Sequence, residues 1–392
     1  MRRTALLIGV VLLVVVSGCA EVADDGDPAD WLDDANDADD ADDANDADDA
    51  DDANDVDDTA DDESTDDGET HVDGTLEIHA INVGQADATL VIGPTGETML
   101  IDSGDWRNDG QIVIDYLESH DISRIDHLVS THGHADHIGG HAAVIEHFET
   151  ERDGIGAVWD SGVAHTSQTY DRYLDAVEEH EVTLFRTQEG DEIPMEGVEA
   201  NVFNPPADSD SNDLHYNSVT VHLTYGNVSF LATGDAESDA ERRMIEEHGE
   251  ALGADIYHAG HHGSSTSSTE SFLDTVRPRV AIVSAAYESQ YGHPHEEVLQ
   301  AFADRDVATY WTATHGTIVF EVDGETITVS TQADATTDPL ALRDEPETDA
   351  DPAAPVEVRE TFATTTAHDT PSTVTATANA YAETPQREVS TA

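Results

Sequence analysis

The stretch STHGHADHIGG, residues 130–140, places three histidines and one aspartate within six consecutive positions. His132, His134, Asp136 and His137 form the pattern H-x-H-x-D-H. Because alternate residues of an extended chain point the same way, His132 and His134 can bind one metal ion together. Asp136 and His137 follow where the chain turns towards a helix, and they can reach a second ion. Imidazole suits zinc and other transition metals, whereas carboxylate also accepts harder ions. The alternative is a surface loop in a chain with 21 histidines.

The segments on either side of this loop have the periodicity of strands and helices. Apolar, β-branched runs predict strands, for example over residues 75–83 and 125–131. Helical spacing follows over residues 110–120 and 137–148. Two similar runs of strands followed by helices predict an α+β domain over residues 75–331, with two packed sheets and helices outside.

The first 19 residues, MRRTALLIGVVLLVVVSGC, predict a targeting segment. Their apolar run is shorter than the roughly 20 residues that span a bilayer, but it has the length of a signal-peptide core. Val-Ser-Gly-Cys resembles a lipobox, so we expect a lipid anchor on Cys19 at the extracellular face of the cytoplasmic membrane. Without the lipid, the protein would be secreted. Cys19 could instead be a buried thiol in an uncleaved anchor.

Residues 20–74 contain an Asp/Ala/Asn repeat with almost no large apolar side chain. Such a segment cannot bury enough surface to fold, and it predicts an acidic, disordered tether. Calcium binding is the alternative, although the repeat lacks the glycine and the final glutamate of an EF-hand loop. Residues 332–392 are rich in Thr, Ala, Pro and Glu without periodicity, which predicts a disordered tail.

The chain is strongly acidic, with 86 acidic and 15 basic residues and a formal net charge of −71. All the basic residues are arginine. Self-repulsion destabilises such a chain in dilute buffer, whereas at 1 M salt the Debye length falls to about 3 Å. The composition resembles that of proteins from halophilic archaea. An ordinary acidic protein and a nucleic-acid mimic are the alternatives.

Several classes of enzyme are excluded by what the sequence lacks. The single cysteine lies in the predicted targeting segment, so neither an internal disulfide nor thiol catalysis is available. There is no G-x-S-x-G elbow, Walker loop or glycine-rich dinucleotide motif.

Six motifs occur in an order that resembles the metallo-β-lactamase superfamily, and more closely the hydrolase domain of ComEC-type DNA-uptake proteins. They are VGQADATLV, LIDSGD, STHGHADHIGG, FLATGD, AGHHGSSTS and YGHPHEEVL, all between residues 75 and 330. The resemblance implies a four-layer αββα sandwich that binds two divalent metal ions. Zinc is the expected metal and manganese the alternative.

The resemblance also implies roles for individual residues. Asp102 would orient the metal-binding loop, and Asp235 would bridge the two ions. His261 would bind the second ion, with His262 as the alternative ligand. His293 would lie on the substrate side. Each residue could instead have a purely structural role: Asp102 as a turn residue, Asp235 as a helix N-cap and His293 in a hydrogen bond within a loop.

The third motif departs from the ComEC pattern D-x-N-x-x-S. This chain reads DLHYNS over residues 213–218, which places His215 at the Asn position and 20 residues before Asp235. His215 could restore the third ligand of the first ion, or it could be a surface histidine. His165 is a weaker candidate for the same role.

These features predict an extracytoplasmic, binuclear metal-dependent hydrolase in which Asp136 and His293 are catalytic. A ComEC-like domain favours a phosphodiesterase or nuclease, with single-stranded DNA as a candidate substrate. No lysine cluster or basic stripe follows a phosphate backbone, which argues against DNA at low salt. A small-molecule hydrolase acting on a lactone, thioester or β-lactam is the alternative, as is a non-catalytic surface binding protein. We expect no protein partner.

Overall fold

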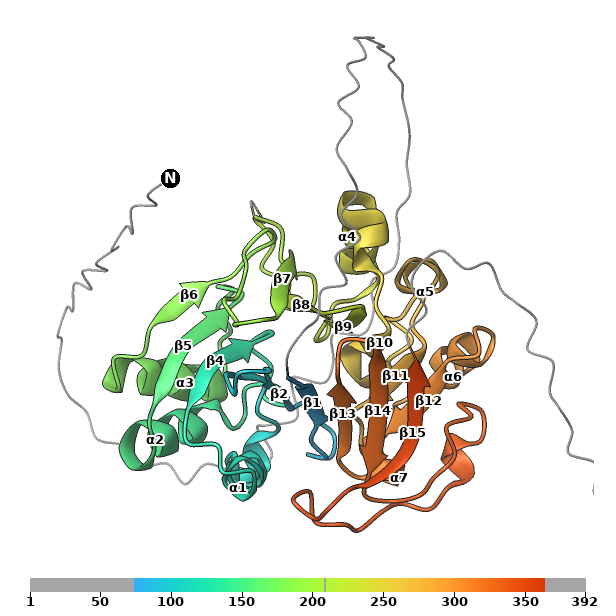
Figure 1. Ribbon diagram of the computed structural model, residues 1–392. Helices are drawn as coiled ribbons and strands as arrows, with labels where there is room; N and C mark the ends of the chain where they lie inside the picture. Colours follow the sequence, from blue (N-terminus) through green and yellow to red (C-terminus); the bar gives the residue numbers. More distant parts are fainter. Residues whose placement is uncertain (1–73, 208, 364–392) are drawn as a thin grey trace, which may run out of the picture. The chain divides into compact units, whose positions relative to one another are not determined.

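The computed structural model describes residues 74–207 and 209–363 (Figure 1). The predicted targeting segment, residues 1–19, and all but the last residue of the predicted acidic tether, residues 20–74, lie outside the described residues. The described part contains two β-sheets and seven α-helices. None of its helices is both long enough and apolar enough to cross a membrane.

The first sheet has nine strands in the order β15-β14-β13-β1-β2-β3-β4-β5-β6. Strands β3 to β6 pair in parallel, and the other neighbours pair antiparallel. The strands are β1 (Leu76–Ala80), β2 (Thr89–Ile92), β3 (Thr98–Ile101), β4 (Ile125–Ser130), β5 (Ile155–Asp160), β6 (Leu184–Arg186), β13 (Ile318–Val322), β14 (Thr326–Thr331) and β15 (Glu357–Ala363).

The second sheet has six strands in the order β12-β11-β10-β9-β8-β7. Strands β9 to β12 pair in parallel, and β7, β8 and β9 pair antiparallel. The strands are β7 (Glu199–Asn204), β8 (Thr220–Tyr225), β9 (Val228–Ala232), β10 (Ile256–His258), β11 (Val280–Val283) and β12 (Ala308–Trp311).

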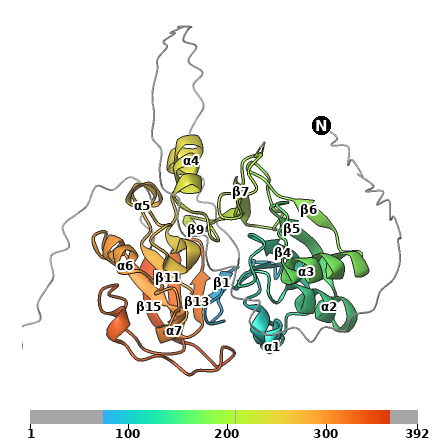
Figure 2. The ribbon, with the colours of Figure 1, turned by 180° about the vertical axis from the view of Figure 1, so that it is seen from behind.

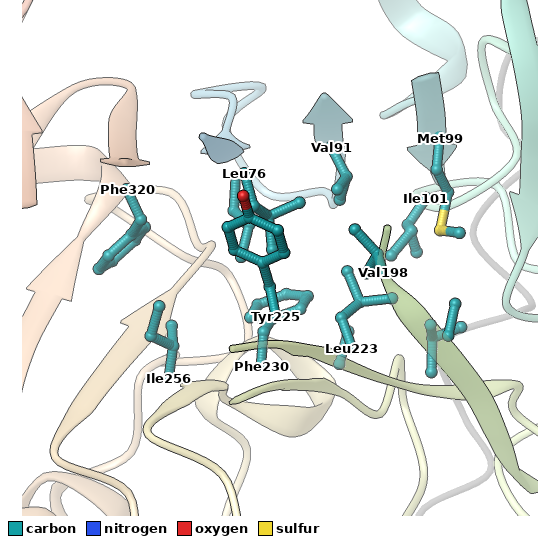
Figure 3. Packing of buried hydrophobic residues seen from close by; sticks show 14 of the residues in the cluster. Leu76, Val91, Met99, Ile101, Val198, Leu223, Tyr225, Phe230, Ile256 and Phe320 are labelled. Atoms are coloured by element: carbon teal, nitrogen blue, oxygen red, sulfur yellow. The ribbon is translucent and has the colours of Figure 1, made fainter. Parts of the chain in front are cut away.

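A hydrophobic core fills the space between the two sheets (Figure 3). Side chains alternate along each strand, so Val221, Leu223 and Tyr225 of β8 enter this core at every second position. From the opposite sheet, β1 contributes Leu76 and Ile78. The alternation therefore fixes which face of each sheet is internal.

Amphipathic helices cover the outer faces of both sheets (Figures 1 and 2). One buried cluster joins the first sheet to α1 (Gln111–Ser119), α2 (His141–Glu151) and α3 (Gln168–Glu179). A second joins the other sheet to α4 (Ser238–His248), α5 (Glu270–Val276) and α6 (Glu296–Ala303). The short helix α7 (Thr312–His315) follows β12. The arrangement confirms the predicted four-layer αββα sandwich.

The prediction of a disordered tail is wrong for residues 332–363. This segment returns to the first sheet, where β15 pairs antiparallel with β14 as the edge strand. Leu342 is fully buried, and the Gln332 side chain donates to the carbonyl oxygen of Pro352 at 2.9 Å. The sequence lacks strand periodicity because β15 is exposed on most positions and is held mainly by backbone pairing. Residues 364–392 lie outside the described part.

The carboxyl ends of parallel strands position the residues that were predicted to form the metal site. Asp102 follows β3 and Thr131 follows β4, which are neighbours in the first sheet. In the second sheet, Asp235 follows β9 and His261 follows the neighbouring β10. The carboxyl ends of parallel strands share one edge of a sheet. His132 beyond β4 reaches Asp235 across the two sheets, with Nε2 and Oδ2 3.6 Å apart.

Candidate metal centre

A buried aspartate anchors the histidine loop that follows β4. Asp102 Oδ1 accepts the backbone N–H of Thr131 at 2.9 Å, and its Oδ2 accepts the Thr131 hydroxyl at 2.7 Å. Oδ2 also lies 2.7 Å from Nδ1 of His137. A carboxylate at Nδ1 holds the proton there, so Nε2 is the nitrogen at which a metal ion would replace a proton. Asp102 therefore orients the loop and His137, as expected from the sequence.

The first ligand group consists of His132, His134, His215 and Asp235, whose nitrogen and oxygen atoms lie within 4.8 Å of one another. His132 Nε2 is 2.8 Å from His134 Nδ1, and the rings of His134 and His215 are 5.0 Å apart. Burial lowers the pKa of His132 well below its ordinary value and lowers that of His134 to about 4. Both imidazoles are therefore neutral and offer lone pairs to a metal ion.

The second ligand group consists of Asp87, His137, Asp235 and His262, again within 4.8 Å and all buried. Nε2 of His137 lies 3.1 Å from Asp235 Oδ1, and Nε2 of His262 lies 3.9 Å from it. Burial lowers the pKa of His262, but Asp235 and Asp136 outweigh it and raise this pKa to about 9. The negative potential that retains a proton here also favours a divalent cation.

Asp235 divides its two carboxylate oxygens between the groups. Oδ2 faces His132 at 3.6 Å, whereas Oδ1 faces His137 at 3.1 Å. Its backbone N–H donates to the Ser218 hydroxyl at 3.1 Å, which fixes the residue after β9. Burial raises the pKa of Asp235, but the surrounding histidines outweigh it and hold this pKa well below its ordinary value. The arrangement suits a carboxylate that bridges two ions.

Several buried polar atoms near Asp235 lack an aligned hydrogen bond, as expected for atoms that bind a metal ion. Such atoms among the described residues include His137 Nε2, Asp235 Oδ1 and His262 Nε2. An unpaired buried polar atom costs roughly 1–3 kcal/mol. All three atoms belong to the second ligand group, so the donor set fits a divalent ion.

The structure departs from the sequence prediction at His261. The prediction placed His261 at the second ion, but the structure brings His262 into the second ligand group. His261 lies instead with His215 and Glu237, with its Nδ1 3.2 Å from Glu237 Oε1, and its Nε2 faces Asp235 Oδ2 at 3.5 Å, on the side of the first ligand group. Both histidines have left-handed backbone, with φ of 50° and 55°, but their Nδ1 atoms have different partners: Glu237 Oε1 for His261 and the Ser284 carbonyl oxygen, at 3.0 Å, for His262. Sequence spacing could not distinguish them.

The two predicted catalytic residues border the groups, and Asp136, which was also predicted to bind the second ion, belongs to neither group. Asp136 Oδ2 lies 3.3 Å from His262 Nε2, and its side chain is 29% exposed. His293 is buried, and its ring stacks near that of His262 at 6.2 Å. Burial lowers the pKa of His293 to about 3, and the neighbouring histidines add to this effect.

The loop around His293 is held from several directions. Gln85 Nε2 lies 3.4 Å from His293 Nδ1, and Gln85 Oε1 accepts the backbone N–H of Ala286 at 3.2 Å. Arg343, in the segment predicted to be disordered, donates to the carbonyl oxygens of Gly292, at 2.6 Å, and Pro294. His293 is therefore fixed beside the two ligand groups.

His165 supports the histidine loop without joining a ligand group among the described residues. Its Nδ1 lies 3.1 Å from the Gly133 carbonyl oxygen, and its ring is 5.5 Å from that of His134. Sequence reasoning missed two residues, Asp87 and Glu237. The signal for Asp87 was its place in the GQADA motif, and for Glu237 its place two residues after Asp235.

Comparisons with known proteins identify the family of this chain. Residues 81–287, more than half of the 392-residue chain, match the model of the metallo-beta-lactamase superfamily. The chain is 28% identical over 260 residues to ComE operon protein 3 of Bacillus subtilis, covering 62% of this chain and 33% of that protein. It is 26% identical over 211 residues to Competence protein ComA of Neisseria gonorrhoeae, covering 54% of this chain and 27% of that protein.

The chain thus spans only about a third or less of the length of these relatives. Among solved structures, the metallo-beta-lactamase fold protein YhfI from Bacillus subtilis aligns with 10% identity and a TM-score of 0.42, covering 63% of this chain and 99% of that one. The family match and the two-sheet fold agree with the order of the sequence motifs. The chain therefore belongs to the metallo-beta-lactamase superfamily and is related to the ComEC competence proteins.

Proposed function

We propose that the protein is an extracytoplasmic, binuclear metal-dependent phosphodiesterase or nuclease. The observation that carries the proposal is Asp235, whose two carboxylate oxygens face two separate ligand groups. The resemblance of the motifs to ComEC-type hydrolase domains, together with similarity to proteins named for competence, favours a phosphodiester substrate such as single-stranded DNA. Zinc is the expected metal, with manganese as the alternative.

The proposed ligands follow from the two groups. His132, His134 and His215 with Oδ2 of Asp235 would hold the first ion. His137, His262 and Oδ1 of Asp235 would hold the second. Two such ions supply Lewis acidity, activate a water nucleophile and offset the negative charge that develops on a phosphodiester.

Asp136 and His293 would handle protons and orient the reactants. Asp136 is partly exposed, so its carboxylate can accept a hydrogen bond from an attacking water and aim it. Gln85 presents its amide N–H to Nδ1 of His293. This arrangement leaves the hydrogen of the neutral imidazole on Nε2, from which it can donate a hydrogen bond to a substrate oxygen.

Charge and location shape the conditions for activity. A net charge of −71 repels a polyanion at low ionic strength, so we propose that the protein works at high salt, where this repulsion is screened. We also propose that Cys19 carries a lipid that holds the domain at the outer face of the membrane. Replacing Cys19 by Ser should release the protein from the membrane fraction.

A substrate panel at molar salt tests the function. Protein supplied with Mn²⁺ or Zn²⁺ is assayed on single-stranded DNA, bis-p-nitrophenyl phosphate, a lactone, a thioester and a β-lactam. We expect cleavage of the two phosphodiesters, and loss of that cleavage in Asp235→Asn. Hydrolysis of only the non-phosphate substrates would overturn the phosphodiesterase assignment. Absence of both bound metal and hydrolysis would favour a binding protein.

A further inference from the structure

Asp87 is a buried carboxylate next to the candidate metal centre that the sequence motifs did not assign to the metal. It is 6% exposed and precedes β2. Its backbone N–H donates to the carbonyl oxygen of Asp136 at 3.1 Å, and its carbonyl oxygen accepts from Gly104 at 2.8 Å. The backbone of Asp87 is therefore fixed between the histidine loop and the loop that follows β3.

The Asp87 side chain shares the space of the second ligand group. It offers an oxygen within 4.8 Å of donor atoms of His137, Asp235 and His262. Oδ1 of Asp87 is buried and lacks an aligned hydrogen bond within the described part of the chain. One atom from each of the other three residues has the same property. Each of the four residues therefore carries one buried polar atom without an aligned hydrogen bond, and the Asp87 carboxylate faces both His258, through Oδ1, and His262, through Oδ2 at 3.9 Å.

A structural ion pair with His258 is the competing explanation. Asp87 Oδ1 lies 3.1 Å from Nε2 of His258. That nitrogen is also 2.9 Å from the Ser284 hydroxyl, and Nδ1 of His258 lies 3.4 Å from the Thr89 hydroxyl. His258 thus has a hydroxyl at each ring nitrogen. A buried carboxylate oxygen without an aligned donor, such as Asp87 Oδ1, is costly, and a bound cation would offset that cost.

We propose that Asp87 is the fourth protein ligand of the second metal ion. This inference rests on the proposed binuclear function and extends it. With Asp87, the second ligand group has two carboxylates and two imidazoles, whereas the first has three imidazoles and one carboxylate. Carboxylate oxygen favours harder ions, so the second position accepts Mn²⁺ more readily than the first. Asp136 is then left to act on the substrate side.

Metal titration of the full chain at molar salt tests the proposal. Protein carrying one equivalent of Zn²⁺ is titrated with Mn²⁺, and free Mn²⁺ is followed by electron paramagnetic resonance. Asp87→Asn should weaken binding of Mn²⁺ at least tenfold and leave the Zn²⁺ content unchanged. Asp160→Asn is the matched control, because Asp160 is buried but is hydrogen-bonded to Gly162 and Tyr173 outside both groups. Asp160→Asn should bind Mn²⁺ like the wild type.

A second variant reports ligation directly and guards against a folding defect in Asp87→Asn. In a Cys19→Ser background, Asp87→Cys loaded with Co²⁺ should show a thiolate-to-cobalt charge-transfer band that the background protein lacks. A folded Asp87→Cys protein without the band, or wild-type Mn²⁺ affinity in Asp87→Asn, would overturn the role of Asp87. If either of these results is found while the wild-type chain still binds two metal ions, only the role of Asp87 fails and the binuclear proposal remains. If the wild-type chain binds neither metal, the proposed function fails as well.

Discussion

Asp102 Oδ2 lies 2.7 Å from Nδ1 of His137, and both side chains are buried. The pair connects the end of β3 to the histidine loop after β4. Burial lowers the pKa of His137, but Asp235 and Asp102 outweigh it and hold this pKa well above its ordinary value. The position of one carboxylate thus determines which nitrogen of His137 faces the second ligand group.

Replacing Asp102 by Asn should weaken metal binding without removing a proposed ligand. The amide N–H₂ would face Nδ1 of His137 and shift the ring hydrogen to Nε2, the atom needed for the metal. Loss of such an outer partner typically costs about 10- to 100-fold in metal affinity or activity. Zn²⁺ affinity and phosphodiester cleavage measure the effect, with Asp160→Asn as the buried-aspartate control. Unchanged affinity in Asp102→Asn would contradict the orienting role.

His215 can be tested as the third imidazole of the first ligand group. His215→Asn restores the residue expected from the ComEC pattern and removes that imidazole. We expect the affinity of the first ligand group for Zn²⁺ to fall by about tenfold or more. Loss of a residue that only hydrogen-bonds to a metal ligand already has an effect of that size. His165→Asn is the control, because His165 touches the same loop but lies outside both groups. Equal Zn²⁺ affinity in the two variants would make His215 a surface residue.

Glu241 should make stability depend on pH. It is fully buried in α4 and accepts the backbone N–H groups of Ser268, at 2.5 Å, and Thr269, at 3.0 Å. Burial raises its pKa from 4.5 to about 7, although the hydrogen bonds lower it. Between these values the folded protein binds more protons than the unfolded chain, so stability falls as pH rises from about 4.5 to 7. Below this window the contribution is fully present.

The Glu241→Gln variant removes that titration. As pH rises from about 4.5 to 7, the free energy of unfolding of the wild type should fall by up to about 3 kcal/mol relative to that of the variant. The amide also changes the stability of the variant by an amount that does not depend on pH. Urea unfolding at several pH values measures the difference. Glu246→Gln, at an exposed position of the same helix, controls for removing one carboxylate. A difference between wild type and Glu241→Gln that stays constant with pH would contradict the assignment.

Leu342 tests whether the segment after β14 belongs to the folded domain. It is fully buried in the core cluster that includes residues of α4, α5 and α6. Leu342→Ala should lower the free energy of unfolding by about 2–5 kcal/mol. Leu340→Ala is the matched control, since Leu340 is 53% exposed and such changes usually stay within about 0.5 kcal/mol. Similar stability of the two variants would mean that the segment packs only loosely.

The sequence predicted most of the fold because periodicity and motif order are local properties. Alternation along β8 and helical spacing in α3 identify faces that must be buried, and the family match confirms the resulting sandwich. The prediction failed for β15 because an edge strand with exposed side chains carries no hydrophobic alternation. The predicted halophilic origin, lipid anchor and substrate stay predictions.

The sequence by itself determined the histidine loop, the aspartates at the strand ends and their order along the chain. A strand followed by a short loop places Asp102, His132 and Asp235 near an edge of its sheet regardless of distant contacts. Only the tertiary structure decided that His262 rather than His261 enters the second ligand group, and that Asp87 joins it. The reason is geometric, because these side chains converge only after the two sheets have packed together.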